Sequence, residues 1–173
     1  MPVTINGSAG VTTNVGAVYN GLQTDTAKAS TSGTSIDFTG IPSWVKRITV
    51  MFDQVSLSGT SAILVQLGDL GGIEATGYAS TVLSDSGSST TDSTSGFILC
   101  NTGLAASTLW KGCLYLSLIS GNKFVGTSTL TRSGGAQYAS GVKDLSATLD
   151  RVRITTVNGT DVFDAGSINI IYE

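Results

Sequence analysis

The sequence predicts an all-β protein: a single antiparallel β-sandwich, jelly-roll-like, over residues 34–173, preceded by an extended N-terminal arm over residues 1–33. Three observations support this fold class. Apolar and polar residues alternate with a period of two in short segments, which clusters of Gly, Ser, Asn and Asp separate. No window with helical periodicity is longer than a turn or two. Only 12% of the 173 residues are charged and 22 are glycine, which suits strands and loops better than helices.

The first 33 residues differ from the rest of the chain in their sequence pattern. Gly and Asn break them into short extended pieces, at Asn6-Gly7, Asn14-Val15-Gly16 and Asn20-Gly21. The segment is nevertheless rich in apolar residues for a tail in water: Val3, Ile5, Val11, Val15, Val18, Tyr19 and Leu22. We therefore expect either an arm that lies on a neighbouring subunit or a disordered leader.

The first two strands of the sandwich are expected at residues 35–38 and 46–53. The first stops before Pro42, because proline lacks a backbone donor and fixes its own φ. In the second, polar and apolar residues alternate, so that one face is exposed to solvent and the other consists of Ile48, Val50 and Phe52. This alternation indicates a sheet with one buried side.

Further strands are expected over residues 62–67, 77–83, 96–101, 112–119, 123–131, 148–157 and 167–172. In the fourth of these, Leu114, Leu116 and Leu118 share one face. Residues 120–122 favour a tight hairpin, and Asn158-Gly159 is a turn signal, so both connections are expected to join antiparallel neighbours. Since residues 149–173 end inside a strand pattern, we expect the carboxyl terminus to be built into a sheet.

Three polar or glycine-rich stretches are expected to be loops. Residues 84–95 contain mostly Ser and Thr and have no apolar anchor, which predicts an exposed loop. Residues 132–141 are interpreted as a second loop at a tip of the sandwich. Residues 68–72 have the glycines of a phosphate-binding loop, but no Lys-Ser/Thr pair and no helix follows, so a turn is expected.

Charge and apolar runs limit the possible partners. The net charge of −3 provides no basic field for phosphate backbones, so nucleic acid is not expected as a partner. No stretch approaches about 18 consecutive apolar residues, so no membrane insertion is expected. The first residues lack the basic and apolar regions of a signal peptide, and we expect assembly in the cytoplasm.

The residue types favour no catalytic, cofactor-binding or metal site. Histidine is absent, which excludes Ser-His-Asp and Cys-His hydrolases. Two carboxylates across a cleft would suffice for glycosidic chemistry, and the candidates are Asp53, Asp69, Glu74, Asp150, Asp161 and Asp164. Most follow strands or lie in turns, where aspartate caps backbone amides. Asp161 with Asp164, or Asp85 with Asp92, offers oxygens to Ca²⁺, but no spacing matches an established calcium loop.

Other side chains have a structural and a functional interpretation. Cys100 and Cys113 lie in separate expected strands without CxxC spacing, which favours buried free thiols. Three arginines stand opposite core positions and are expected either in solvent or in cross-strand ion pairs: Arg47, Arg151 and Arg153. Five aromatic residues serve either the core or a sugar-stacking or subunit surface: Trp44, Trp110, Tyr78, Tyr115 and Tyr138.

Two motifs resemble structural proteins of tailed bacteriophages. They are TSIDFTGIPSWVKRITVMF at residues 34–52 and LDRVRITTVNGTDVFDAGSINIIYE at residues 149–173, and VQLGD at 65–69 and GIEATGY at 72–78 look similar. The likeness extends over roughly residues 30–173. It implies a tail-fibre or surface-decoration protein of the virion, a homotrimer, and an arm that holds the domain to other virion proteins. The short leader, without a fibrous shaft, favours a place directly on the head or tail.

Three hypotheses about function follow. The first is a non-enzymatic virion protein, a short tail fibre of receptor-binding type anchored by its arm, with the sandwich facing the host surface and host glycan as a possible ligand. Its contact regions would be residues 84–95 and 132–141. The second is a capsid decoration, or cement, protein that stabilises the head lattice. The third is a carbohydrate-active enzyme.

Overall fold

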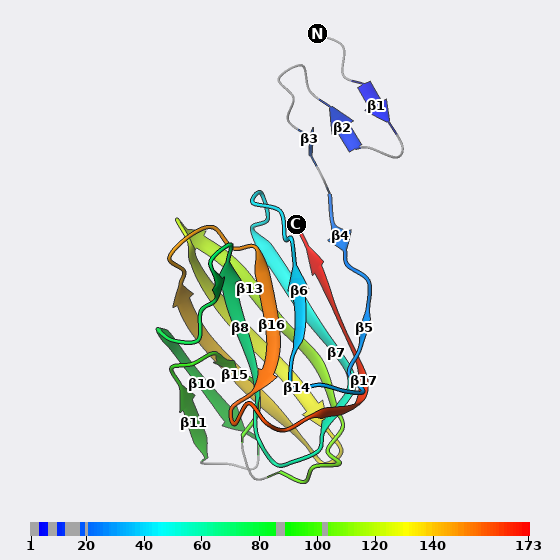
Figure 1. Cartoon of the computed structure of the whole chain (residues 1–173), viewed down its shortest axis with the longest axis vertical. Coiled ribbons are helices and arrows are strands. Elements are labelled where there is room, and N and C mark those ends of the chain that lie inside the picture. The colour runs from blue at the N-terminus through cyan, green and yellow to red at the C-terminus, as the bar shows by residue number, and fades with distance from the viewer. Residues whose placement is uncertain (1–3, 7–9, 13–17, 20, 86–88, 102–103) are drawn as a thin grey trace.

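The computed structural model describes residues 4–6, 10–12, 18–19, 21–85, 89–101 and 104–173. These residues form strands and connections without a helix, and two antiparallel sheets pack face to face (Figure 1). The all-β antiparallel sandwich expected from the sequence is therefore confirmed. Its hydrophobic core lies between the two sheets, where both contribute the inward half of each alternating strand.

The larger sheet has nine strands in the order β11-β10-β15-β14-β13-β7-β17-β4, and β5 also pairs with β17. The strands, in this order and with β5 last, are Thr90–Ser93, Tyr78–Ser84, Gly135–Asp144, Lys123–Arg132, Trp110–Ser120, Arg47–Leu57, Phe163–Tyr172, Gln23–Thr24 and Lys28–Ala29. Every pairing in this sheet is antiparallel. Residues 120–122 form the expected hairpin, since Ser120 pairs with Lys123.

The smaller sheet has five strands in the order β12-β8-β16-β6, with β9 also paired to β8. The strands, with β9 last, are Phe97–Ile98, Ile63–Asp69, Arg151–Thr156, Ile36–Thr39 and Gly72–Ile73. All seven residues of β8 are buried. The turn expected at residues 68–72 is confirmed, because Asp69 pairs with Gly72 in the β8–β9 hairpin.

Three short strands near the N-terminus form a separate small sheet. They are β1 (Thr4–Asn6), β2 (Gly10–Thr12) and β3 (Val18–Tyr19). Of the apolar arm residues, Val3 and Val15 lie outside the described part of the chain. Further along, β4 and β5 pair with β17, and the Ser30 hydroxyl donates to the Ala165 carbonyl at 2.7 Å. Residues 23–30 thus line the edge of the larger sheet, and the boundary at residue 33 stays a prediction.

The expected alternation places the large side chains in the core. Ile48, Val50 and Phe52 of β7 are buried, as are Leu114 and Leu116 of β13. Each fully buried side chain of this size contributes about 1.5–3 kcal/mol to folding. Leu118, expected on the same face, is partly buried and packs against the core.

The prediction of a loop over residues 132–141 is wrong. Residues 135–144 form β15, a central strand between β10 and β14. The strand was missed because its inward positions are not large apolar residues: Gln137, Ala139, Gly141 and Lys143. The two polar ones are buried with partners, since Gln137 donates to the Ser84 hydroxyl at 3.0 Å and Lys143 pairs with Glu74. Polar contacts therefore replace the apolar pattern by which strands are recognised.

Two further expectations need correction. Residues 90–93, inside the expected loop 84–95, form edge strand β11 on β10. Asn158-Gly159 does form a turn, with a φ of 67° at Gly159, but the strands that it connects are not neighbours. β16 lies in the smaller sheet and β17 in the larger. Turn residues specify a reversal of the chain, whereas the partner of each strand depends on which sheet buries its apolar face.

The carboxyl terminus lies in the larger sheet, as expected. β17 runs to Tyr172, and the amide of Glu173 donates to the Arg47 carbonyl at 3.0 Å. The Arg47 guanidinium and the Glu173 carboxylate also form an ion pair at 2.8 Å, although both side chains are largely exposed. Since exposed pairs contribute little, the backbone ladder holds this end of the chain in place.

Candidate functional site

The outer face of the larger sheet, turned away from the smaller sheet, exposes several large apolar side chains. They come from β10, β13 and β15: Leu83, Tyr115, Ile119, Tyr138 and Val142. Hydroxyl side chains lie between them, and one row across five strands, in register, consists of Thr81, Ser140, Thr127, Tyr115 and Thr49. This face therefore combines exposed rings and aliphatic groups with neutral hydroxyls.

Two shallow hollows on this face join to form a trough over β11, β10 and β15. The hollows have volumes of about 420 and 320 Å³, and both are lined by Thr81 and Ser140. Leu83 and Tyr138, which are cross-strand partners, lie at one end, and Asp92 of β11 lies at the other. We refer to Thr81, Leu83, Asp92, Tyr138 and Ser140 together as the β10 trough.

The β10 trough carries one charged side chain among its described lining residues. The Thr81 hydroxyl donates to Oδ1 of Asp92 at 2.6 Å, and this contact orients the carboxylate. Within the described part of the chain, no hydrogen bond to Oδ2 of Asp92 is formed. The trough thus offers hydroxyls, one carboxylate oxygen and an exposed aromatic ring.

A buried polar network holds β10 and β15 together beneath the trough. The phenol of Tyr78 donates to the Glu74 carbonyl at 2.9 Å and accepts from the Leu67 amide at 2.7 Å. Lys143, directly opposite Tyr78, forms an ion pair with Glu74 at 2.5 Å, and its side chain is 5% exposed. Because these strands are fixed from the inside, the outward side chains of the trough are presented on a rigid support.

The titratable groups of this network have pKa values set by burial and by their hydrogen-bond partners. Burial alone would raise the pKa of Glu74, but hydrogen bonds from Lys143 and Ser146 outweigh it and hold that pKa below its ordinary value. Burial raises the pKa of Tyr78, so its phenol remains protonated. A hydrogen bond from Ser146, with another from the Gly71 amide, lowers the pKa of Asp69. The network therefore keeps fixed charges at neutral pH.

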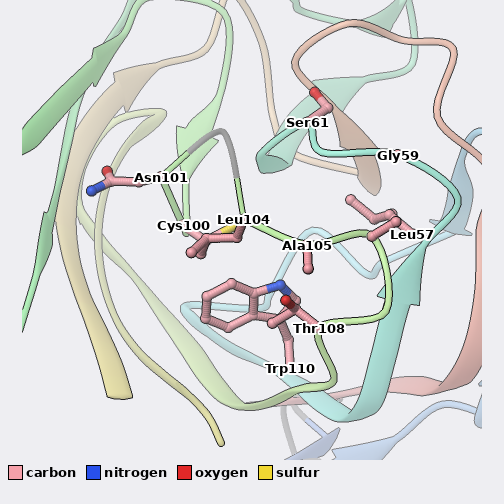
Figure 2. Close-up of a pocket in the computed structure, with 10 residues that line it drawn as sticks. Leu57, Gly59, Ser61, Cys100, Asn101, Leu104, Ala105, Thr108 and Trp110 are labelled. Carbon is pink, nitrogen blue, oxygen red and sulfur yellow. The ribbon is translucent and has the colours of Figure 1, made fainter. Parts of the chain in front are cut away.

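A third hollow is lined by the ends of β7 and β13 and by the segment that follows β12. Figure 2 shows Cys100 and Leu104 side by side above the ring of Trp110, with Leu57 and Ala105 on the other side of the hollow. Burial raises the pKa of Cys100 to about 12, and its sulfur accepts from the Ile63 amide at 3.2 Å. A thiol in this state is not a nucleophile at neutral pH, so Cys100 is a core residue. Cys113 is also a free thiol and is partly buried.

The carboxylates considered for catalysis or calcium binding are distributed over the molecule, and half of the eight accept from backbone amides. Asp69 accepts from the Gly71 amide at 2.7 Å, Asp85 from Ala136 at 2.7 Å, and Asp161 from Ser61 at 2.9 Å. Asp150 pairs with Arg151, Asp164 accepts from the Ser56 hydroxyl, and Asp53 is exposed on β7. Among the described residues, no group of three or more His, Cys, Asp or Glu side chains is placed to hold a metal ion.

The arginines and the remaining aromatic residues have mainly structural contacts. Arg153 forms a two-pronged pair with Asp37, its partner on β6, with both contacts at 2.7 Å. Trp44 packs against Tyr172, with 6.0 Å between the ring centroids, and Trp110 is buried. Of the five aromatic candidates, only Tyr115 and Tyr138 are available at the surface, each 50% exposed.

Sequence reasoning found part of the trough and missed the way it is assembled. Tyr138 was singled out, and Asp92 was noted as a possible calcium ligand. Thr81 and Leu83 were missed. The period-two pattern of residues 77–83 was a usable signal for these two, because it turns both outward on one face. Ser140 was included only as part of the expected contact region 132–141, since β15 was not recognised.

Comparisons with known proteins provide no further assignment: no protein family, no curated protein and no solved structure matches the chain. In the part of the chain that the structure describes, no helix is long and apolar enough to cross a membrane.

Proposed function

We propose that the chain is a non-enzymatic structural protein of a tailed-phage virion, a short tail-fibre protein of receptor-binding type. In this proposal the N-terminal arm attaches it to other virion proteins, and the sandwich faces the host surface. It acts as a homotrimer, so that three weak contacts to a host surface add up through avidity.

One observation carries the proposal. The two segments that resemble phage structural proteins, residues 34–52 and 149–173, pair with each other in both sheets. β6 pairs with β16 in the smaller sheet, where Phe38 lies opposite Val152. β7 pairs with β17 in the larger sheet, where Val50 lies opposite Ile170. Two stretches about a hundred residues apart thus form one structural unit, as expected if the resemblance reflects a shared scaffold.

The distribution of polar groups supports a role without catalysis. Asp69 and Asp161 are engaged as backbone caps, and Glu74 is held in an ion pair. The exposed face instead offers neutral side chains on rigid strands, which suits contact with another surface. Such a contact surface suits a tail fibre and a decoration protein equally, and the position of the chain on the particle distinguishes the two.

Immunoelectron microscopy of the phage that carries the gene tests the proposal. An antibody raised against the purified chain should label washed particles at the tail, whereas pre-immune serum should not. Label distributed over the whole head would contradict the tail assignment and favour a decoration protein. Absence of the chain from washed particles, measured by immunoblot, would refute a virion role.

A further inference from the structure

We infer that the β10 trough is a binding site for a neutral glycan. The inference deepens the proposed function and rests on it only for the place where such a glycan is met, the host surface. The trough consists of Thr81, Leu83, Asp92, Tyr138 and Ser140, brought together by the pairing of β10 with β11 on one side and β15 on the other.

The side chains of the trough match the two kinds of surface on a sugar ring. The half-exposed ring of Tyr138 and the 44% exposed side chain of Leu83 form an apolar end, against which the C–H face of a sugar can pack. The exposed residues Thr81 and Ser140 lie two residues further along the strands on the same face, so their hydroxyls are roughly 7 Å away. The Ser140 hydroxyl can donate to and accept from the hydroxyl groups at the edge of the same ring, and the Thr81 hydroxyl, whose proton is donated to Asp92, can accept from them.

The single charge of the trough selects against acidic ligands. Asp92 is the one ionised side chain among the described lining residues, and no Lys or Arg is present among them. An anionic ligand such as a phosphate or a sialylated sugar would therefore meet repulsion without a counter-charge. A neutral sugar has hydroxyl groups that donate to Oδ2 of Asp92, and a hydrogen bond to a carboxylate is stronger than one between neutral groups.

The same features disfavour a flat protein partner at this position. The trough is a shallow, open depression, with hollows of about 420 and 320 Å³, a size that a sugar ring can occupy. A second chain closing over it would also have to desolvate the Asp92 carboxylate and supply a donor for it. The geometry thus favours a ligand that brings hydroxyl donors and leaves the site partly in water.

Titration of the isotope-labelled full chain with defined sugars, followed by NMR, tests the inference. The probes are neutral oligosaccharides of glucose, galactose and N-acetylglucosamine, with sialyllactose as the acidic counterpart. At least one neutral sugar should shift the amide signals of β10, β11 and β15, and sialyllactose should bind less well. Tyr138→Ala should weaken binding about tenfold, and Asp92→Asn several-fold.

The matched control is Tyr115→Ala. Tyr115 is equally exposed and lies on the same face of the sheet, but it is outside the trough, so its loss should leave sugar binding unchanged. The inference is overturned if none of the neutral sugars binds, if sialyllactose binds best, or if Tyr138→Ala has no effect. It is also overturned if Tyr138→Ala dissociates an oligomer in sedimentation, which would make the trough a subunit interface. Sugar binding is measured on the isolated chain, so its failure is distinguishable from failure to label virions.

Discussion

Gly126 of β14 tests whether the two sheets pack as tightly as the structure shows. A Cβ atom at this position would lie 2.9 Å from the ring of Phe97 and 3.0 Å from a methyl group of Leu116. Phe97 comes from the smaller sheet and is 1% exposed, and its ring packs edge-on against Tyr78 at 5.4 Å. Because the ring is buried and Tyr78 packs against it, Gly126→Ala must push the sheets apart or strain a rotamer.

The expected magnitude follows from two opposing effects. Adding a methyl group to a well-packed core costs about 1–3 kcal/mol, whereas alanine stabilises by about 0.4–1 kcal/mol because it restricts the unfolded chain. The net loss for Gly126→Ala is therefore up to about 2.6 kcal/mol, with a central value of about 1.3 kcal/mol, at which the midpoint of thermal unfolding falls by about 3–5 °C. Gly126→Val adds two more methyl groups to the same space and should lose more.

Urea unfolding followed by tryptophan fluorescence measures these free energies. Gly21→Ala is the matched control, since a Cβ there has nothing within 4 Å and reports the unfolded-chain effect alone. It should leave the unfolding free energy within about 0.5 kcal/mol of wild type or raise it. If Gly126→Ala is as stable as this control, or if the Val variant is no worse than the Ala variant, the close approach of Phe97 is wrong.

Three further predictions concern buried polar groups. Lys143→Met leaves the Glu74 carboxylate without its cation and should lower the free energy of unfolding in urea by about 2 kcal/mol. Adding Glu74→Gln should recover part of this loss, and additive effects of the two substitutions on the unfolding free energy would contradict the coupling. The pKa of Glu74 is lowered in the folded state, so its stabilising effect is present at neutral pH and is lost as the pH falls from about 5. Glu74→Gln should reduce this loss of stability at low pH, and a pH profile equal to that of wild type would contradict the role of Glu74. In Cys113→Ser protein, Cys100 should react with a thiol reagent only on unfolding, and fast reaction of the native protein would show that it is accessible.

The fold class was predictable because the apolar alternation in most strands is simple. Ile48, Val50 and Phe52 were assigned to the core from their spacing alone, and all three are buried. β15 was not predictable from such a pattern, because Gln137 and Lys143 occupy inward positions. Their burial is tolerated because groups remote in sequence accept their hydrogen bonds: Ser84 for Gln137, and Glu74 and the Thr76 carbonyl for Lys143.

The trough was predictable only in fragments. Tyr138 and Asp92 were assigned to two separate loops, and neither loop exists as expected. In the structure both segments pair with β10, which brings the ring and the carboxylate to one surface. Strand pairing depends on contacts between residues far apart in the sequence. The residues of β11 and β15 therefore do not by themselves indicate that both strands pair with β10.

The sequence by itself determined the all-β class, the tight turns and most of the core, because these depend on local backbone preference and on a period of two along the chain. Only the tertiary structure decided which strands are neighbours. β16 and β17 show the difference: the residues Asn158-Gly159 predict the turn between them, yet the two strands belong to different sheets. β16 pairs with β6 and β8, and β17 pairs with β7, since the apolar faces of these five strands are buried only when the two sheets close on each other.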